Sequence, residues 1–336
     1  MSDRLRKAPS GAVVSESKFE SATRGPAILG EGGRRSPQRR GGRTSYKTKP
    51  VGILFILPAL AFIFAFMLFP LLYSAYMSLT EYNFVYDPGP TFIGLENYFA
   101  AFRDPLFLTS LTNSFVFGTF YFVIVMIASL SIALLLFQKL KFNSFYRSSI
   151  FVPLVVPLSL ACLAFLWILQ PSYGLLNYLL GDVLHLQFLT RAWLSHGDTA
   201  MGSIIGVALW ATVGLETILF LGGLQSISPD MLEAADVDGA YGLKKIFYVI
   251  LPNLRETFVV TGVWAIIHAL KVFEEPVVMT DGGPGTSTLV LYQHVYQTAF
   301  SYFDMGYASA IGYILGAIIL LLIGLNFWVA RRGETK

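Results

Sequence analysis

The sequence predicts an all-α membrane protein with six transmembrane helices and a helical loop on its cytoplasmic side. The 336-residue chain is 54% hydrophobic and only 13% charged, whereas soluble domains carry about 25% charged residues. Its apolar residues gather in blocks of about 20, the length that a helix needs to cross a hydrocarbon core of roughly 30 Å. Segments in lipid must pair their own backbone groups, and no run of alternating ten-residue strands suggests a barrel.

Six apolar blocks are expected to form the spans, over residues 52–79, 111–137, 150–169, 202–224, 258–279 and 307–330. Residues 1–49 are rich in Gly, Ser, Pro and Arg and show no apolar periodicity, so we expect a disordered basic tail. This tail could fix the topology or lie on anionic lipid headgroups. Residues 50–330 then form one six-helix domain, and residues 331–336 form a second short tail.

The distribution of basic residues predicts the orientation. With the N-terminus inside, 21 of the 24 Lys and Arg fall in cytoplasmic segments, only Arg103 and Arg191 lie outside, and Lys271 lies within a span. Cytoplasmic segments are expected to carry such an excess. Both termini are therefore predicted to be cytoplasmic, in a multi-pass protein of the cell membrane. Since membrane topology accounts for these basic residues, no nucleic-acid partner is expected.

Catalytic and metal-binding signals are missing from the sequence. Cys162 is the single cysteine and lies in the third span, where a buried thiol is the ordinary interpretation. The four histidines form no ligand pair at helical spacing. The glycine-rich stretch at residues 282–285 lacks the context of a phosphate loop and is expected to be a turn. We therefore expect no enzyme, metal or cofactor, and any transport must draw its energy from an ion gradient or another subunit.

The segment between the fourth and fifth spans begins as a capped helix would. Ser228 suits the N-cap, Pro229 suits the first helical position, and acidic residues such as Glu233 are favoured near a helix N-terminus. Gly239 can take the left-handed conformation that ends a helix. The pattern predicts a helix that runs to about residue 238.

A second short helix is expected over about residues 242–250, ahead of Leu251 and Pro252. In the first helix, Ala234 and Ala235 present almost no side chain, so another surface could approach its backbone closely. Any helical hairpin between spans needs caps and a glycine, however. These residues by themselves leave a docking helix and a plain connector equally open.

The order Glu233-Ala234-Ala235, three residues, Gly239, nine residues, then Val249-Ile250-Leu251-Pro252 resembles the coupling loop of permease subunits in binding-protein-dependent ABC importers. The resemblance implies that the first helix docks into a cleft of an ATPase subunit, with Glu233, Ala234, Ala235 and Gly239 at the joint. It also implies a second permease in a heterodimer, ABC ATPase subunits and an extracytoplasmic solute-binding protein. Val249 replaces the family's usual isoleucine, and the next two upstream positions are aromatic where they are often basic.

Two further segments resemble external loops of sugar-type permeases. Residues 92–98 (Phe-Ile-Gly-Leu-Glu-Asn-Tyr) are similar to the first external loop of that family. Residues 280–285 (Thr-Asp-Gly-Gly-Pro-Gly) are similar to the loop after the fifth span in permeases like the larger maltose-transporter subunit, except that Asp281 replaces a glycine. The resemblance extends over about residues 50–330 and implies a carbohydrate substrate. Glycerol-phosphate and amino-sugar systems share these loops.

The fifth span carries a polar stripe that suggests a solute path. At 100° per residue, Trp264, His268, Lys271 and Glu275 fall within about 60° of one another on a helix. Charges within a span cost roughly 2.5–3.5 kcal/mol each and usually face a bundle interior or a water-filled path. Lys271 and Glu275 could pair. Alternatively, Lys271 extends toward the interface and the acidic residues simply mark the end of the span.

In the fourth span, Thr212 and Glu216 share a helix face, and the depth of Glu216 predicts an internal partner. An alternative to the importer is a gradient-driven secondary transporter that uses Glu216, Lys271 or Glu275 as ion or proton sites. That class often shows inverted repeats, which this sequence lacks. It also has no need of the motif over residues 233–252.

Overall fold

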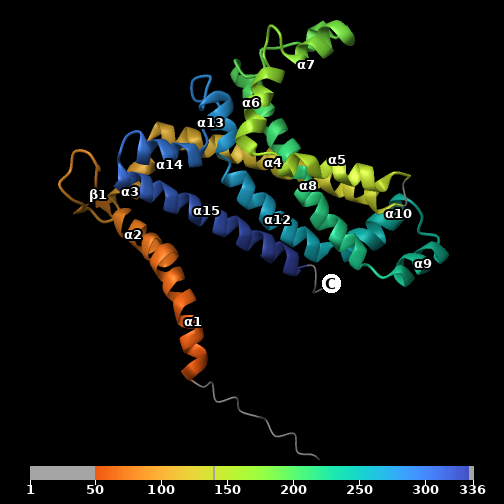
Figure 1. Cartoon of the computed structure of the whole chain (residues 1–336), viewed down its shortest axis with the longest axis horizontal. Helices are drawn as coiled ribbons and strands as arrows, with labels where there is room; N and C mark the ends of the chain where they lie inside the picture. Colours follow the sequence, from red (N-terminus) through yellow and green to blue (C-terminus); the bar gives the residue numbers. More distant parts are fainter. Residues whose placement is uncertain (1–49, 139–140, 333–336) are drawn as a thin grey trace, which may run out of the picture. The chain divides into compact units, whose positions relative to one another are not determined.

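The computed structural model describes residues 50–138 and 141–332, which are mostly α-helical (Figure 1). The chain divides into two units, Met1–Ile56 and Leu57–Lys336. The first unit contributes only residues 50–56, the start of helix α1 (Pro50–Ile63), to the described part. All other described elements belong to the second unit. The basic tail predicted over residues 1–49 lies outside the described residues, as does most of the predicted tail over 331–336.

Within the described ranges, five helical stretches are long and apolar enough to cross a membrane. The first joins α1 and α2 (Phe69–Met77) through the π-helical turn η1 (Phe64–Leu68). The others are α4 (Pro105–Phe137), α8 (Gly197–Ser226), α12 (Arg255–Leu270) continued by α13 (Glu274–Thr280), and α15 (Met305–Arg332). They confirm long apolar helices at the first, second, fourth, fifth and sixth predicted spans.

The third predicted span differs from expectation because it is not one straight helix. The structure has α5 (Asn143–Val155) and α6 (Leu158–Ile168), bent by 100° at the break between them. Val156 is extended, with ψ 128°, and precedes Pro157. Proline disfavours helical conformation in the residue before it, which explains the bend. Counted as one span, the bent pair brings the total to the predicted six.

The core of the bundle lies around α4 and α8. These two helices run side by side, α12 packs against both, and α15 packs against α12 (Figure 1). Phe117 of α4, Ile204 of α8 and Ala265 of α12 share one buried cluster. In its most apolar stretch α8 is 56% buried, whereas the most apolar stretch of the first span is 0% buried. The first span therefore exposes its apolar surface, which lipid or another subunit must cover.

Short elements connect the long helices. They are β1 (Thr80–Glu81), paired antiparallel with β2 (Thr91–Phe92), then α3 (Glu96–Ala101), α7 (Leu175–Tyr178), η2 (Leu179–Val183), η3 (Gln187–Leu189) and α14 (Leu291–Phe300). The loop between α8 and α12 holds α9 (Pro229–Val237), α10 (Leu243–Lys245), η4 (Ile246–Ile250) and α11 (Leu251–Asn253).

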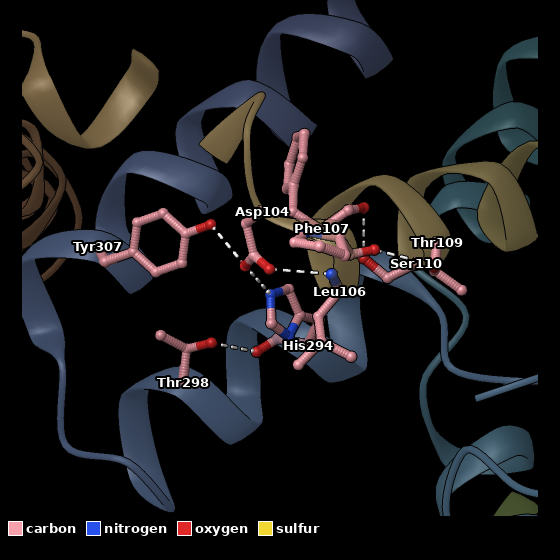
Figure 2. Close-up of polar contacts among 9 residues, drawn as sticks. Asp104, Leu106, Phe107, Thr109, Ser110, His294, Thr298 and Tyr307 are labelled. Carbon is pink, nitrogen blue, oxygen red and sulfur yellow. Dashed lines mark hydrogen bonds and ion pairs between the residues drawn. The ribbon is translucent and has the colours of Figure 1, made fainter. Parts of the chain in front are cut away.

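One carboxylate joins three helices far apart in the sequence (Figure 2). Asp104 caps α4, because its Oδ1 accepts a hydrogen bond from the Leu106 backbone at 2.9 Å. Its Oδ2 accepts from the Tyr307 hydroxyl of α15 at 2.9 Å and lies 3.6 Å from His294 Nε2 of α14. Burial lowers the pKa of His294, and the neighbouring Asp104 opposes this effect. We call Asp104, His294 and Tyr307 the three-helix junction.

Candidate functional site

The first helix of the loop begins and ends where the sequence predicts. The Ser228 hydroxyl accepts a hydrogen bond from the Met231 backbone at 3.2 Å, and Pro229 opens α9. Gly239 follows the last turn with φ +79°, in the left-handed region. The Ala240 amide donates to the Ala235 carbonyl oxygen at 2.9 Å, which satisfies a carbonyl at the helix end. Local capping signals therefore account for this helix.

The second helical part of the loop is more broken than predicted. The expected helix over 242–250 is α10, the π-helical turn η4 and α11 in succession, after Gly242 with φ +56°. Lys245 Nζ lies 2.8 Å from Asp236 Oδ1 and so ties the second part to α9. Sequence reasoning missed this ion pair, because eight residues, two of them glycines, separate its members. Only the reversal of the chain brings them together.

The loop packs on the ends of the long helices through a few apolar side chains. Leu232 of α9 and Ile246 of η4 contact a buried cluster that includes Phe220 and Leu224 of α8 and Ala133 of α4. This apolar contact fixes the loop relative to α4 and α8, while the ion pair holds the two parts of the loop together.

The predicted docking residues divide between two faces of α9. Glu233 and Ala234 are exposed, whereas Ala235 is buried against the protein itself. Of the two alanines, only Ala234 thus offers its backbone for close approach. Val237, at the end of the exposed face, is 88% exposed. Near the start of α12, Leu251 is half-buried and Pro252 exposed.

The fourth-span carboxylate has the internal partner that its depth predicted. Glu216 is fully buried in α8, and the Tyr121 hydroxyl of α4 donates to its Oε1 at 3.3 Å. The Thr212 hydroxyl, one turn earlier, lies 2.8 Å from the same tyrosine hydroxyl. Thr212 also donates to the Ala208 carbonyl oxygen at 2.8 Å. These contacts place Glu216 in the seam between α4 and α8.

The fifth-span stripe does not stay on one helix face, and this expectation needs correction. The helix is interrupted over residues 271–273, between α12 and α13. Pro276 explains the interruption, because it cannot donate to the Val272 carbonyl and its ring crowds that group. Trp264 and Lys271 are exposed, whereas Glu275 is buried.

The expected pairing of Lys271 with Glu275 is also replaced. Glu275 Oε1 instead lies 3.8 Å from His268 Nε2, and the His268 ring stacks at a tilt on Tyr121 with centroids 5.2 Å apart. Among the described residues, Lys271 forms no ion pair. The polar residues of the fifth span thus separate into an inward pair, His268 and Glu275, and an accessible pair, Trp264 and Lys271.

Comparisons with known proteins found relatives that match most of the chain. No protein-family model matches the chain. It is 37% identical over 292 residues to the probable ABC transporter permease protein YurN of Bacillus subtilis (strain 168), covering 86% of this chain and 99% of the relative. It is 33% identical to the arabinooligosaccharides transport permease AraP of the same organism, covering 86% and 92%. It is 31% identical to the sulfoquinovosyl glycerol transport permease SmoG of Agrobacterium fabrum (strain C58 / ATCC 33970), covering 84% and 90%.

Among solved structures, the fold is similar to a chain of a bacterial ABC transporter that imports the acidic polysaccharide alginate. The TM-score is 0.72, and the match covers 84% of this chain and 95% of that chain at 19% identity. That identity supports the fold alone. The curated relatives match at higher identity over nearly their whole length, and they are named as transport permeases rather than enzymes. The chain therefore belongs to the family of ABC transporter permeases, integral membrane subunits of ATP-binding-cassette transport systems.

Proposed function

We propose that the chain is the membrane-spanning subunit of an ATP-driven carbohydrate importer. It forms the solute path with a second, similar permease, and it works with ABC ATPase subunits and an extracytoplasmic solute-binding protein. Relatives named for arabinooligosaccharide and sulfoquinovosyl glycerol transport support a carbohydrate solute. The two external segments that resemble sugar-type permeases agree with this choice.

The coupling site in this proposal is the exposed face of α9. Glu233 and Ala234 contact the ATPase, Ala235 and Gly239 hold the helix in place, and Leu251 and Pro252 connect the loop to α12. The observation that carries this assignment is the capped helix itself, anchored on α4 and α8 by Leu232 and tied to the second part of the loop by the Lys245–Asp236 ion pair. Closure of the ATPases then moves α9, and the two central helices follow.

The solute path runs past the accessible pair of the fifth span. Trp264 is 49% exposed and Lys271 is exposed, so both can meet a solute at the surface of the subunit. An indole face packs against the CH face of a sugar, and an ammonium group donates to its hydroxyls. Glu216 and Glu275 are buried and His268 is half-buried, so these residues hold the helices around the path rather than contact the solute.

The orientation follows from the basic residues. Both termini and the α9 loop lie in the cytoplasm, where ATP is available, and the segments before α4, before α8 and after α13 lie outside. Tags at about residues 145 and 240 are then protected from external protease in sealed right-side-out vesicles, whereas tags near 88, 185 and 284 are cleaved. Cleavage at residue 240 would contradict this topology.

The decisive experiment reconstitutes the assembled transporter and measures uptake of labelled maltose, trehalose and N,N′-diacetylchitobiose with and without ATP. We expect ATP-dependent uptake of at least one sugar, and we expect Glu233→Lys to abolish it while the protein still inserts. Uptake driven by a proton or sodium gradient without ATP would instead support a secondary transporter. Full ATPase stimulation in Glu233→Lys would remove the coupling assignment.

A further inference from the structure

Between α6 and α8 the chain folds around one asparagine. Asn177 Nδ2 donates to the carbonyl oxygens of Pro171 at 3.0 Å and Arg191 at 2.9 Å. Its Oδ1 accepts from the Arg191 backbone at 3.3 Å and from the Trp193 indole at 2.8 Å. A primary amide has two donors and an oxygen with two lone pairs, so all of its hydrogen-bonding capacity is used. The asparagine closes residues 171–193 into a fixed loop.

This loop encloses a pocket of about 710 Å³, within the range of roughly 300–1,000 Å³ that small-molecule sites occupy. Its wall includes two aromatic side chains, Tyr173 and Tyr178, which are 68% and 55% exposed. It also includes Asp182, Gln187 and Arg191. Across the described ranges, the side chains of these three polar residues make no hydrogen bond or ion pair. The pocket thus combines a fixed floor with side chains that remain free to bind.

The chemistry of the wall selects a neutral ligand that carries many hydroxyl groups. An anion would be attracted by Arg191 but repelled by Asp182, and a cation would meet the opposite problem. Hydroxyl groups both donate and accept hydrogen bonds, so several of them on one ligand can pair with the carboxylate, the guanidinium and the amide at the same time. The tyrosine rings offer apolar faces for CH groups.

We propose that the 171–192 pocket binds carbohydrate on the outer side of the permease before the solute reaches the membrane path. This inference rests on the proposed carbohydrate function. A second depression of about 340 Å³ shares Pro171 with the pocket and is lined by Leu194 and by Met279 and Thr280 at the end of α13. The two depressions together lead from the outer loop toward the helix that carries Glu275.

The test uses the full chain in the assembled transporter, in nanodiscs and without binding protein. Saturation-transfer NMR measures binding of maltose, trehalose and N,N′-diacetylchitobiose to wild type, Tyr178→Ala and Arg191→Gln. Tyr86→Ala is the matched control, because Tyr86 is 82% exposed and lies outside the pocket. We expect both pocket variants to weaken binding of the imported sugar about tenfold, the effect of losing one good polar or stacking contact, and the control to leave it unchanged. In a separate measurement, with the same transporter in sealed proteoliposomes and the binding protein added, ATP-dependent uptake at low sugar concentration should fall in the same two variants.

Equal sugar binding in wild type and both pocket variants would overturn the pocket while leaving sugar import intact. Reduced stimulation by the binding protein with unchanged sugar binding would also overturn it, and would assign the loop to protein contact. If wild type imports none of the three sugars, the carbohydrate function itself fails, a result that is visible before any variant is measured. Assembly of each variant with its partner subunits confirms that the substitutions leave the fold intact.

Discussion

The α9 loop and the fifth span are both polar interruptions of an apolar chain, but different forces shape them. In the loop, the cap at Ser228 and the left-handed Gly239 act within one or two turns of the residues that they order. In the fifth span, the direction of each polar side chain depends on a break at residues 271–273 and on contacts with α4. The helix of the loop can therefore be predicted from neighbouring residues in the sequence, whereas the contacts of the fifth-span side chains are known only from the structure.

The largest effect is expected from a substitution that disrupts the left-handed turn at the end of α9. Gly239→Val should reduce ATP-dependent uptake about tenfold or more, because a β-branched residue is strained at positive φ. Nothing lies within 4 Å of an added Cβ at this position, so the effect is one of backbone conformation alone. Gly239→Asn is the matched control, since asparagine tolerates this conformation. Equal loss of uptake in both variants would show that the left-handed turn is not the cause.

The second prediction concerns the long-range contact between Glu216 of α8 and Tyr121 of α4. Glu216→Ala should lower the free energy of unfolding by about 2–4 kcal/mol, because it leaves a buried cavity and removes the hydrogen bond between the Tyr121 hydroxyl and Glu216. Glu216→Gln should lose much less, since its amide oxygen can still accept that hydrogen bond. Unfolding of the purified complex in increasing SDS measures both. An unchanged midpoint for Glu216→Ala would mean that the contact between α4 and α8 does not stabilise the bundle.

The third prediction separates the two pairs of the fifth span. Lys271→Ala and Trp264→Ala should leave the unfolding midpoint unchanged but reduce uptake several-fold or change sugar preference, because accessible groups that read a substrate discriminate strongly. His268→Ala should instead lower the midpoint. Uptake of several labelled sugars is measured in membranes with matched protein levels. Wild-type rates and preference in both accessible variants would leave Trp264 and Lys271 without a role in the path.

The fourth prediction concerns the three-helix junction, where stability should depend on pH. Burial lowers the pKa of His294 below its ordinary value, so the unfolded chain binds the proton more readily than the folded chain. The stability that depends on neutral His294 is therefore fully present above about pH 6.5, the ordinary pKa of histidine. This stability is lost as the pH falls below that value, because the unfolded chain then takes up the proton. Melting temperatures between pH 5 and 8 should fall on acidification in wild type and less so in His294→Gln. Parallel curves would exclude His294 as the group responsible.

The smallest expected effect concerns the ion pair between Lys245 and Asp236. Its side chains are 21% and 45% exposed, and such pairs contribute about 0.2–1 kcal/mol. A double-mutant cycle with Lys245→Ala and Asp236→Ala should give a coupling energy in this range that shrinks at high salt. A coupling energy of zero would show that the ion pair does not hold the two parts of the loop together and would leave that role to apolar contacts such as those of Leu232 and Ile246.

Much of the fold could be predicted because the bilayer constrains it so strongly. Apolar blocks of about 20 residues have few alternatives to a spanning helix, and five of the six blocks are straight or nearly continuous helices. The third block, over residues 150–169, also forms apolar helix, but it bends at Pro157 instead of running straight. The proline was visible in the sequence, but neither the 100° angle of the bend nor the contact of α6 with α13 could be read from it.

Sequence alone determined the class of the protein, the spans, the caps of α9 and the left-handed turn at Gly239, because each depends on neighbouring residues or on the thickness of a membrane. Tertiary structure alone decided that Ala235 faces inward, that Asp236 meets Lys245, and that His268 rather than Lys271 faces Glu275. It also decided that Asn177 closes the loop over residues 171–193 around a pocket. The physical reason is the same in each case: these contacts join residues whose distance in space is set by bends and packing, which no helical period encodes.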